Sequence, residues 1–138
     1  MAGTVEFPVL VRLIGRGPRE SAGVGCLLRY LPEDPFAVHL QFPGALTEDG
    51  EDAVWVFSRE LLTRGAAGAR VGDGDVRVLP GRPGRTYIQL RSGTGAALLE
   101  VETERLHEFV RASEDCVPPG AESGWLDWDA ELTRLLYD

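Results

Sequence analysis

Hydrophobic residues along the chain fall into short runs that glycine, proline or acidic residues separate. Several runs alternate apolar and polar positions with a period of two, which is typical of strands. In one of them, Phe36, Val38, Leu40 and Phe42 share a single face. Short glycine-containing turns join the last three runs, which favours an antiparallel meander. The pattern predicts strands over residues 5–14, 24–31, 36–42, 53–57, 76–80, 86–91 and 96–101.

The strand predicted over residues 53–57 has apolar side chains on both faces, because Trp55 and Phe57 alternate with Val54 and Val56. We therefore expect other parts of the fold to cover both faces. We assign four residues of this strand and of the segment after it to the structural core: Trp55, Phe57, Leu61 and Leu62.

The segment after this strand is typical of a short helix. Ser58 is placed to cap its first turn, since a serine hydroxyl accepts a hydrogen bond from an otherwise unpaired backbone N–H there. We expect Gly65 to end the helix, because glycine adopts the left-handed conformation of a helix C-cap without steric cost. The run from Gly72 to Asp75 then predicts a turn into the strand that begins at Val76.

Two helices are predicted in the C-terminal part. One begins near Thr103, an expected N-cap residue, and Leu106, Phe109 and Val110 repeat at the spacing of one buried helical face. The other opens at Asp127. The whole pattern predicts a single α+β domain over residues 1–138, with a mostly antiparallel sheet of about seven strands and a short helix between strands four and five.

The net charge of −8 is unevenly distributed along the chain. Residues 1–99 contain 11 acidic and 11 basic side chains, whereas residues 100–138 contain 11 acidic and 3 basic ones. Phosphate repulsion therefore disfavours nucleic-acid binding through the C-terminal portion. No apolar run is long enough to cross a membrane and no signal-peptide pattern opens the chain, so we expect a cytoplasmic protein without membrane insertion. In such a reducing compartment Cys26 and Cys116 are expected as two buried thiols.

Residues that carry chemistry in other proteins do not assemble into a known motif. His39 and His107 lack a neighbouring catalytic partner, and the residues after Asp73-Gly74-Asp75 do not supply calcium ligands. Arg82 and Arg85 flank flexible backbone N–H groups that can cradle an anion, although a simple turn is the favoured interpretation. The sequence thus predicts a protein that is not an enzyme, with no catalytic, cofactor-binding or metal-binding residues.

Two tryptophans stand near the predicted last helix. Trp125 and Trp128 either pack on the sheet or, beside the acidic Asp129, form an exposed aromatic pair suited to a protein interface. We take Trp125, Trp128 and Asp129 as the candidate partner-binding residues.

Four motifs together carry a family resemblance: LRYLPEDPFAVHLQF, VWVFSRELLTRG, GDGDVRVLPG, and VPPG followed by WLDWDAEL. Their combination resembles the SsgA-like proteins, the actinobacterial family of sporulation-specific cell-division regulators. The resemblance runs from about Leu27 to Leu136, and its most specific part is the predicted strand, helix and strand over residues 53–80.

The resemblance implies a non-enzymatic role in choosing and preparing septum sites during sporulation-specific division. It also implies a whirly-like architecture, homotrimers, a location at the division septum, and as partners the division GTPase FtsZ or other divisome or SsgA-like proteins. No cofactor is expected.

Two other functions remain open at this stage. A whirly-like architecture and the arginine-rich turn over residues 82–91 suggest a module that binds single-stranded nucleic acid, although the net charge argues against this ligand. A pocket for a small ligand between helix and sheet ranks last, because no converging polar cluster is visible.

Overall fold

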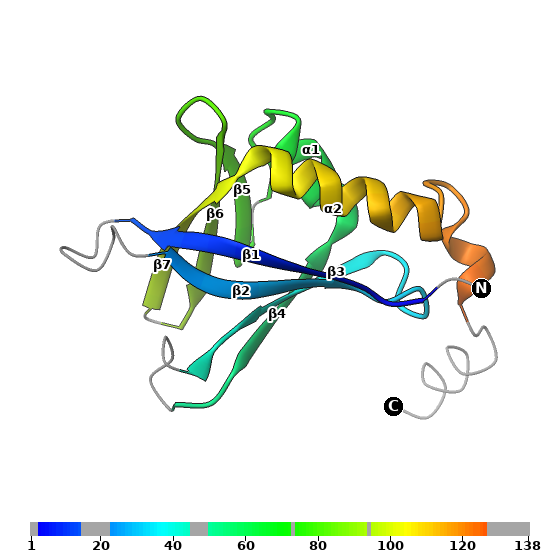
Figure 1. Cartoon of the computed structure of the whole chain (residues 1–138), viewed down its shortest axis with the longest axis horizontal. Coiled ribbons are helices and arrows are strands. Elements are labelled where there is room, and N and C mark those ends of the chain that lie inside the picture. Colours follow the sequence, from blue (N-terminus) through cyan, green and yellow to red (C-terminus); the bar gives the residue numbers. More distant parts are fainter. Residues whose placement is uncertain (1–2, 15–22, 45–49, 73, 94, 127–138) are drawn as a thin grey trace.

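The computed structural model describes residues 3–14, 23–44, 50–72, 74–93 and 95–126. Its seven strands form one sheet in the order β4-β3-β2-β1-β7-β6-β5, and every pair of neighbours is antiparallel (Figure 1). The strands are β1 Val5–Leu13, β2 Gly23–Tyr30, β3 Ala37–Phe42, β4 Ala53–Ser58, β5 Val76–Pro80, β6 Arg85–Ser92 and β7 Gly95–Glu102. The predicted antiparallel sheet and its closing meander are confirmed.

Three helical segments accompany the sheet: α1 Arg59–Ala66, α2 Thr103–Cys116 and the short 3-10 turn η3 Glu122–Trp125. The predicted short helix between the fourth and fifth strands is α1, and the first predicted C-terminal helix is α2. The helix predicted to open at Asp127 lies outside the described residues. In Figure 1, α2 runs along one side of the sheet above β1, with α1 behind it.

The core lies between the two helices and one face of the sheet. Leu106, Phe109 and Val110 form the buried stripe of α2, as the sequence predicts, and they pack with buried residues of all seven strands. The opposite face of the sheet carries no described helix, and several of its apolar side chains are exposed, among them Leu10, Val54 and Val56. This one-sided arrangement determines which apolar residues are exposed.

The expectation that both faces of β4 are covered is wrong. Phe57 is buried and Trp55 is partly buried against the core, but Val54 and Val56 are each 53% exposed. Both valines point to the sheet face that the helices leave open, and β4 is an edge strand with a single neighbour, β3. Phe36 also differs from the expectation, because it precedes β3 in a turn and is exposed.

Helix α1 begins as predicted and ends later. The Ser58 hydroxyl accepts a hydrogen bond from the Leu61 N–H at 3.0 Å, which confirms the cap. Gly65 does not end the helix, which continues to Ala66, and the left-handed residue is Gly68. Gly65 instead lets α1 approach β5, because a Cβ there would overlap the side chain of Val78.

The start of α2 also differs from the expectation. Thr103 is the first helical residue and not the N-cap, which is Glu102, and no side chain caps this end. The Thr103 hydroxyl lies 2.7 Å from that of Thr86 on β6, and its backbone N–H donates to Gly84. The turn before β6 therefore satisfies one of the backbone N–H groups that are unpaired at the start of α2.

Candidate protein-interaction surfaces

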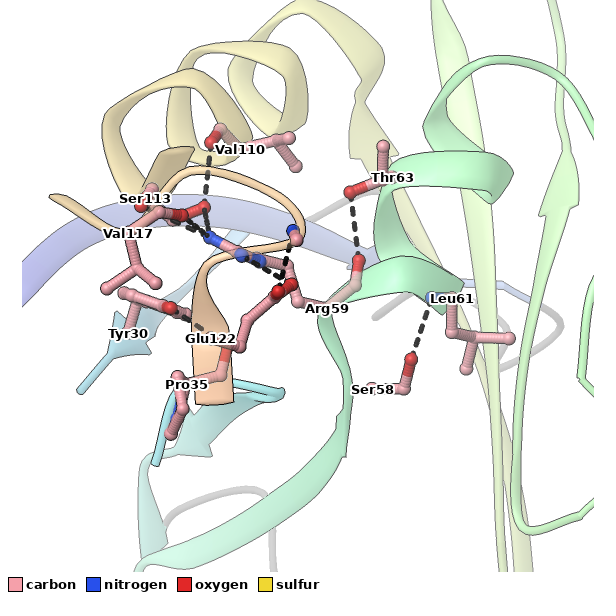
Figure 2. A network of polar contacts seen from close by, with 11 residues as sticks. Tyr30, Pro35, Ser58, Arg59, Leu61, Thr63, Val110, Ser113, Val117 and Glu122 are labelled. Atoms are coloured by element: carbon pink, nitrogen blue, oxygen red, sulfur yellow. Dashed lines mark hydrogen bonds and ion pairs between the residues drawn. The ribbon is translucent and has the colours of Figure 1, made fainter. Parts of the chain in front are cut away.

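A buried arginine connects the beginning of α1 with the end of α2. Arg59 is the first residue of α1 and is only 4% exposed. Its Nη1 donates to the backbone oxygens of Ser113 and Val117 at 3.2 and 2.8 Å, and to the Ser113 hydroxyl at 3.4 Å (Figure 2). The last carbonyls of a helix have no partner within the helix and form its negative end. Arg59 therefore acts as the C-terminal cap of α2.

The second guanidinium nitrogen of Arg59 holds the η3 turn. Nη2 lies 3.0 Å from Glu122 Oε2, while Glu122 Oε1 accepts a hydrogen bond from the Gly120 N–H at 2.7 Å. The pKa of Glu122 is lowered, first by a backbone hydrogen bond at Glu122 itself and, against the effect of burial, by Arg59 and Gly120. The carboxylate thus stays charged near neutral pH.

Tyr30 forms the base of this arrangement, which we call the Arg59 hub: Tyr30, Arg59, Ser113, Val117 and Glu122. The Arg59 guanidinium lies 4.8 Å from the centre of the Tyr30 ring, within the range of a cation–π interaction. The Tyr30 hydroxyl donates to the Pro35 oxygen at 2.8 Å, and burial raises its pKa. Through these contacts the hub ties β2, α1, α2 and η3 together.

The hub anchors the turn that ends at Trp125. Trp125 ends the η3 turn that begins at Glu122, and its side chain is 40% exposed. A tryptophan with this much exposed surface on an anchored turn suits the centre of a protein interface. Trp128 and Asp129, the other two candidate partner-binding residues, lie outside the described residues.

A groove separates the end of β4 from the segment before β5. Its volume is about 680 Å³, and its walls come from the end of β4, from α1 and from residues 70–72 and 74–76. Leu61, assigned to the core by sequence, is partly buried and lines this groove, whereas Leu62 is fully buried. Charged side chains of both signs surround the groove: Glu60, Arg64, Arg70 and Asp75.

The turn that follows β5 contains Arg82 and Arg85, and it contacts a carboxylate of the same chain, that of Glu100. Arg82 donates to both oxygens of the buried Glu100, at 3.1 Å from Nε and 3.0 Å from Nη2. Arg12 and Arg85 approach the same carboxylate at 3.5 and 4.0 Å. The hydrogen bond from Arg82 lowers the pKa of Glu100 although burial opposes it. The favoured interpretation, a turn, agrees with the Arg85 N–H bonding to the Arg82 oxygen at 2.8 Å.

Each described histidine lies close to an oxygen atom of the same chain, and both cysteines are free thiols. His107 Nε2 lies 2.7 Å from the Ala66 oxygen at the end of α1, and His39 Nε2 lies 3.3 Å from Asp34. Cys26 is buried, which raises its pKa to about 11, and Cys116 is half-buried rather than buried. In the described part of the chain, no three His, Cys, Asp or Glu residues gather as a metal site would require, and no helix has the length and apolarity to span a membrane.

Sequence reasoning missed Arg59 and the exposed valines of β4. A basic residue in the first turn of a helix opposes the helix dipole, and this local conflict was a signal that Arg59 has a partner elsewhere in the fold. The valines gave a weaker signal, because apolar residues on both faces occur in buried and in edge strands alike.

Comparison with known proteins gives a consistent family assignment. The family model described as "Streptomyces sporulation and cell division protein, SsgA" matches residues 24–122. The sporulation-specific cell division protein SsgB of Streptomyces coelicolor is 39% identical over 141 residues, covering 100% of this chain and 99% of the relative. SsgB of Kineococcus radiotolerans is 40% identical, covering 96% and 79% of the two chains.

Solved structures extend the similarity to the fold. An SsgA-like sporulation-specific cell division protein from Thermobifida fusca superposes with a TM-score of 0.75 and 33% identity, covering 96% of both chains. A structure described with SsgB mutations that correlate to longitudinal cell division in Streptomyces coelicolor gives a TM-score of 0.74 and 35% identity, covering 91% of this chain and 97% of the other. The chain therefore belongs to the SsgA family of sporulation and cell-division proteins.

Proposed function

We propose that this protein is a non-enzymatic regulator of sporulation-specific cell division. In this proposal it acts as an oligomeric adaptor that helps to select septum sites and recruits or localises the division GTPase FtsZ there. The observation that carries the proposal is the match to SsgB of Streptomyces coelicolor, which spans 100% of this chain and bears the name of a sporulation-specific cell division protein.

The described surface supports an adaptor. Trp125 is exposed on a turn that the Arg59–Glu122 ion pair fixes to the body, so a partner meets an aromatic residue whose backbone is anchored. A preorganised anchor costs less entropy on binding than a mobile one. Acidic residues dominate the C-terminal portion that contains Trp125, and they suit a partner surface that is basic at its rim.

The proposal places the protein in the cytoplasm at the division septum, as a homotrimer. Light scattering on the purified chain tests the trimer, and a single monomeric species would contradict it. In sporulating hyphae, a fluorescent fusion of this chain should mark future septum sites before FtsZ does. Arrival of the fusion only after FtsZ would contradict a recruiting role, whereas failure of FtsZ to arrive without the protein would support it.

A single-stranded nucleic-acid-binding module is the alternative function, and the charge distribution argues against it. Arg12, Arg82 and Arg85 all approach Glu100, so these cations already have an anionic partner within the chain. Fluorescence anisotropy with a labelled single-stranded DNA at low salt tests this function. Salt-sensitive binding would favour the alternative, because counterion release makes phosphate binding weaken steeply with salt.

A further inference from the structure

The hydrogen-bonding phase of the β3–β4 ladder shows which groups of β4 face its free edge. The Arg59 N–H donates to the Phe36 oxygen at 2.8 Å, and this pair continues the register in which Ala37 faces Ser58. Hydrogen-bonded and non-hydrogen-bonded pairs alternate along an antiparallel ladder. Val54 and Val56 face Gln41 and His39, so both fall in non-hydrogen-bonded pairs. Their N–H and C=O groups therefore point away from β3, toward the edge.

The two edges of the sheet differ in whether another described segment forms backbone hydrogen bonds to them. At the β5 edge, Val71 forms an isolated bridge with Val78, and the two residues exchange N–H to oxygen bonds of 3.0 Å each. At the β4 edge, no described residue makes a backbone hydrogen bond to Val54 or Val56 outside the β3 ladder. Within the part of the chain that the structure describes, only the β5 edge is covered in this way.

Strand β4 also lacks the features that keep edge strands from pairing with other chains. Such features are charged side chains, proline and bulges. Residues 53–58 read AVWVFS and contain no charge and no proline, and their register with β3 is continuous. The side chains of Val54 and Val56 are exposed on the open sheet face, beside the same edge. An uncharged, half-exposed edge of this kind is suited to accept another strand.

We propose that β4 is a docking edge for an extended segment of a partner protein, which adds to the sheet as a further strand at Val54 and Val56. Main-chain hydrogen bonds to these two residues supply register, and apolar side chains of the segment cover their exposed surface. The end of the segment nearest Ser58 enters the groove of about 680 Å³ between β4, α1 and residues 70–72 and 74–76. The inference rests on the proposed function only in taking the partner to be a protein.

The exposed backbone groups of β4 favour a polypeptide segment as the binding partner. A row of outward N–H and C=O groups is matched by another polypeptide backbone and not by a phosphate chain, which offers acceptors alone. Around the groove Arg64 and Arg70 are balanced by Glu60 and Asp75, so the site does not favour a polyanion. The partner segment should therefore be apolar, β-branched at alternate positions and low in net charge.

A second copy of this chain fits the edge less well. The β5 edge of a neighbouring copy is occupied by Val71, so a head-to-tail ring of β4 onto β5 is blocked. Pairing of β4 with β4 of a second copy is an isologous contact, which closes a dimer and does not build a trimer.

The test uses the full chain and a phage-displayed library of random twelve-residue peptides, so its outcome does not depend on FtsZ. Selected peptides are then added to the isotope-labelled protein, and amide hydrogen exchange is followed by NMR. We expect the amides of Val54 and Val56 to exchange fast in the free protein and to become at least about tenfold slower with a bound peptide, whereas Trp55 and Phe57 are protected in both states. Unchanged exchange at the two valines, or no enrichment of binding peptides, would overturn the proposal.

Two variants of Val56 distinguish the contribution of its backbone N–H to peptide binding from that of its side chain. Val56→Pro removes an N–H that β3 does not use, so it should leave the β3–β4 ladder intact and weaken peptide binding by about tenfold. Val56→Thr keeps the N–H and a β-branched side chain at an exposed strand position, and binding should change less than about threefold. Equal loss in both variants would contradict strand addition. Protection of Val54 and Val56 that grows with protein concentration, without peptide, would assign the edge to a second copy and overturn the proposal.

Discussion

Arg59 Nη2 lies 3.0 Å from Glu122 Oε2, and this ion pair joins the first residue of α1 to a turn that follows the end of α2. The same guanidinium donates to the Ser113 and Val117 oxygens, so one side chain both caps α2 and fixes the turn that presents Trp125. A residue outside the candidate interface therefore anchors the turn that carries Trp125.

Replacing Arg59 with methionine should destabilise the protein by about 3–5 kcal/mol, because two helix-terminal carbonyls and the Glu122 carboxylate lose their donor together. Glu122→Gln should cost less, about 1–3 kcal/mol, since the carbonyl contacts of Arg59 remain. Urea unfolding followed by circular dichroism measures both changes. Arg64→Met is the control, an exposed arginine of the same helix, and should change stability by less than about 0.5 kcal/mol. An equal effect of Arg59→Met and Arg64→Met would refute the hub.

Stability should fall in acid through Glu100 and Glu122. Both carboxyl groups have a pKa below their ordinary value of 4.5 in the folded state. A depressed pKa contributes stability above the unfolded value, and that contribution is lost as the pH falls through the folded value. We expect the urea midpoint to decrease below about pH 4.5, and less steeply in Glu100→Gln and Glu122→Gln. Variants that retain the slope of the unmodified protein would contradict these assignments.

Gly65→Ala should destabilise the protein by about 1–2 kcal/mol, because its new Cβ overlaps the buried Val78 and this outweighs the gain in helix propensity. Thermal unfolding measures the change. Gly25→Ala is the control, because a Cβ at Gly25 meets no atom within 4 Å. Adding Val78→Ala to Gly65→Ala should recover part of the loss relative to Val78→Ala alone. No such coupling between the two positions would show that the close approach of α1 and β5 is not the cause.

Trp125→Ala should reduce partner binding without a comparable loss of stability, because its side chain is exposed and the hub does not depend on it. An interface anchor of this type is worth about 2 kcal/mol or more, or roughly thirtyfold in affinity. Binding to FtsZ polymers and urea unfolding are measured on the same preparation. Leu10→Ala removes an apolar side chain on β1 that is more exposed than that of Trp125, and it serves as the control. Equal binding by the two variants would remove Trp125 from the interface.

The sequence predicted local structure well where neighbouring residues decide it. The cap at Ser58, the apolar stripe of α2 and the strands of the meander all follow from short-range patterns. The end of α1 was predicted wrongly because Gly65 serves a distant contact with Val78, and a pattern of spacing does not distinguish this from a helix cap.

The candidate surfaces depended on long-range packing and were harder to predict. Trp125 was identified from its residue type, but the ion pair that positions it joins residues 63 positions apart. The open face of Val54 and Val56 follows from strand order, which places β4 at an edge, and alternation along one strand carries no information about its neighbours. Likewise, Arg82 and Arg85 suggested an anion without indicating that Glu100 supplies it.

Direct recruitment of FtsZ is the central claim, and co-sedimentation with assembled FtsZ polymers across a salt series tests it most directly. We predict that the full chain pellets with polymers at low salt, remains in the supernatant without them, and stays in the supernatant more often when Trp125 is replaced by alanine. A chain that remains in the supernatant with assembled polymers even at the lowest salt would contradict direct recruitment.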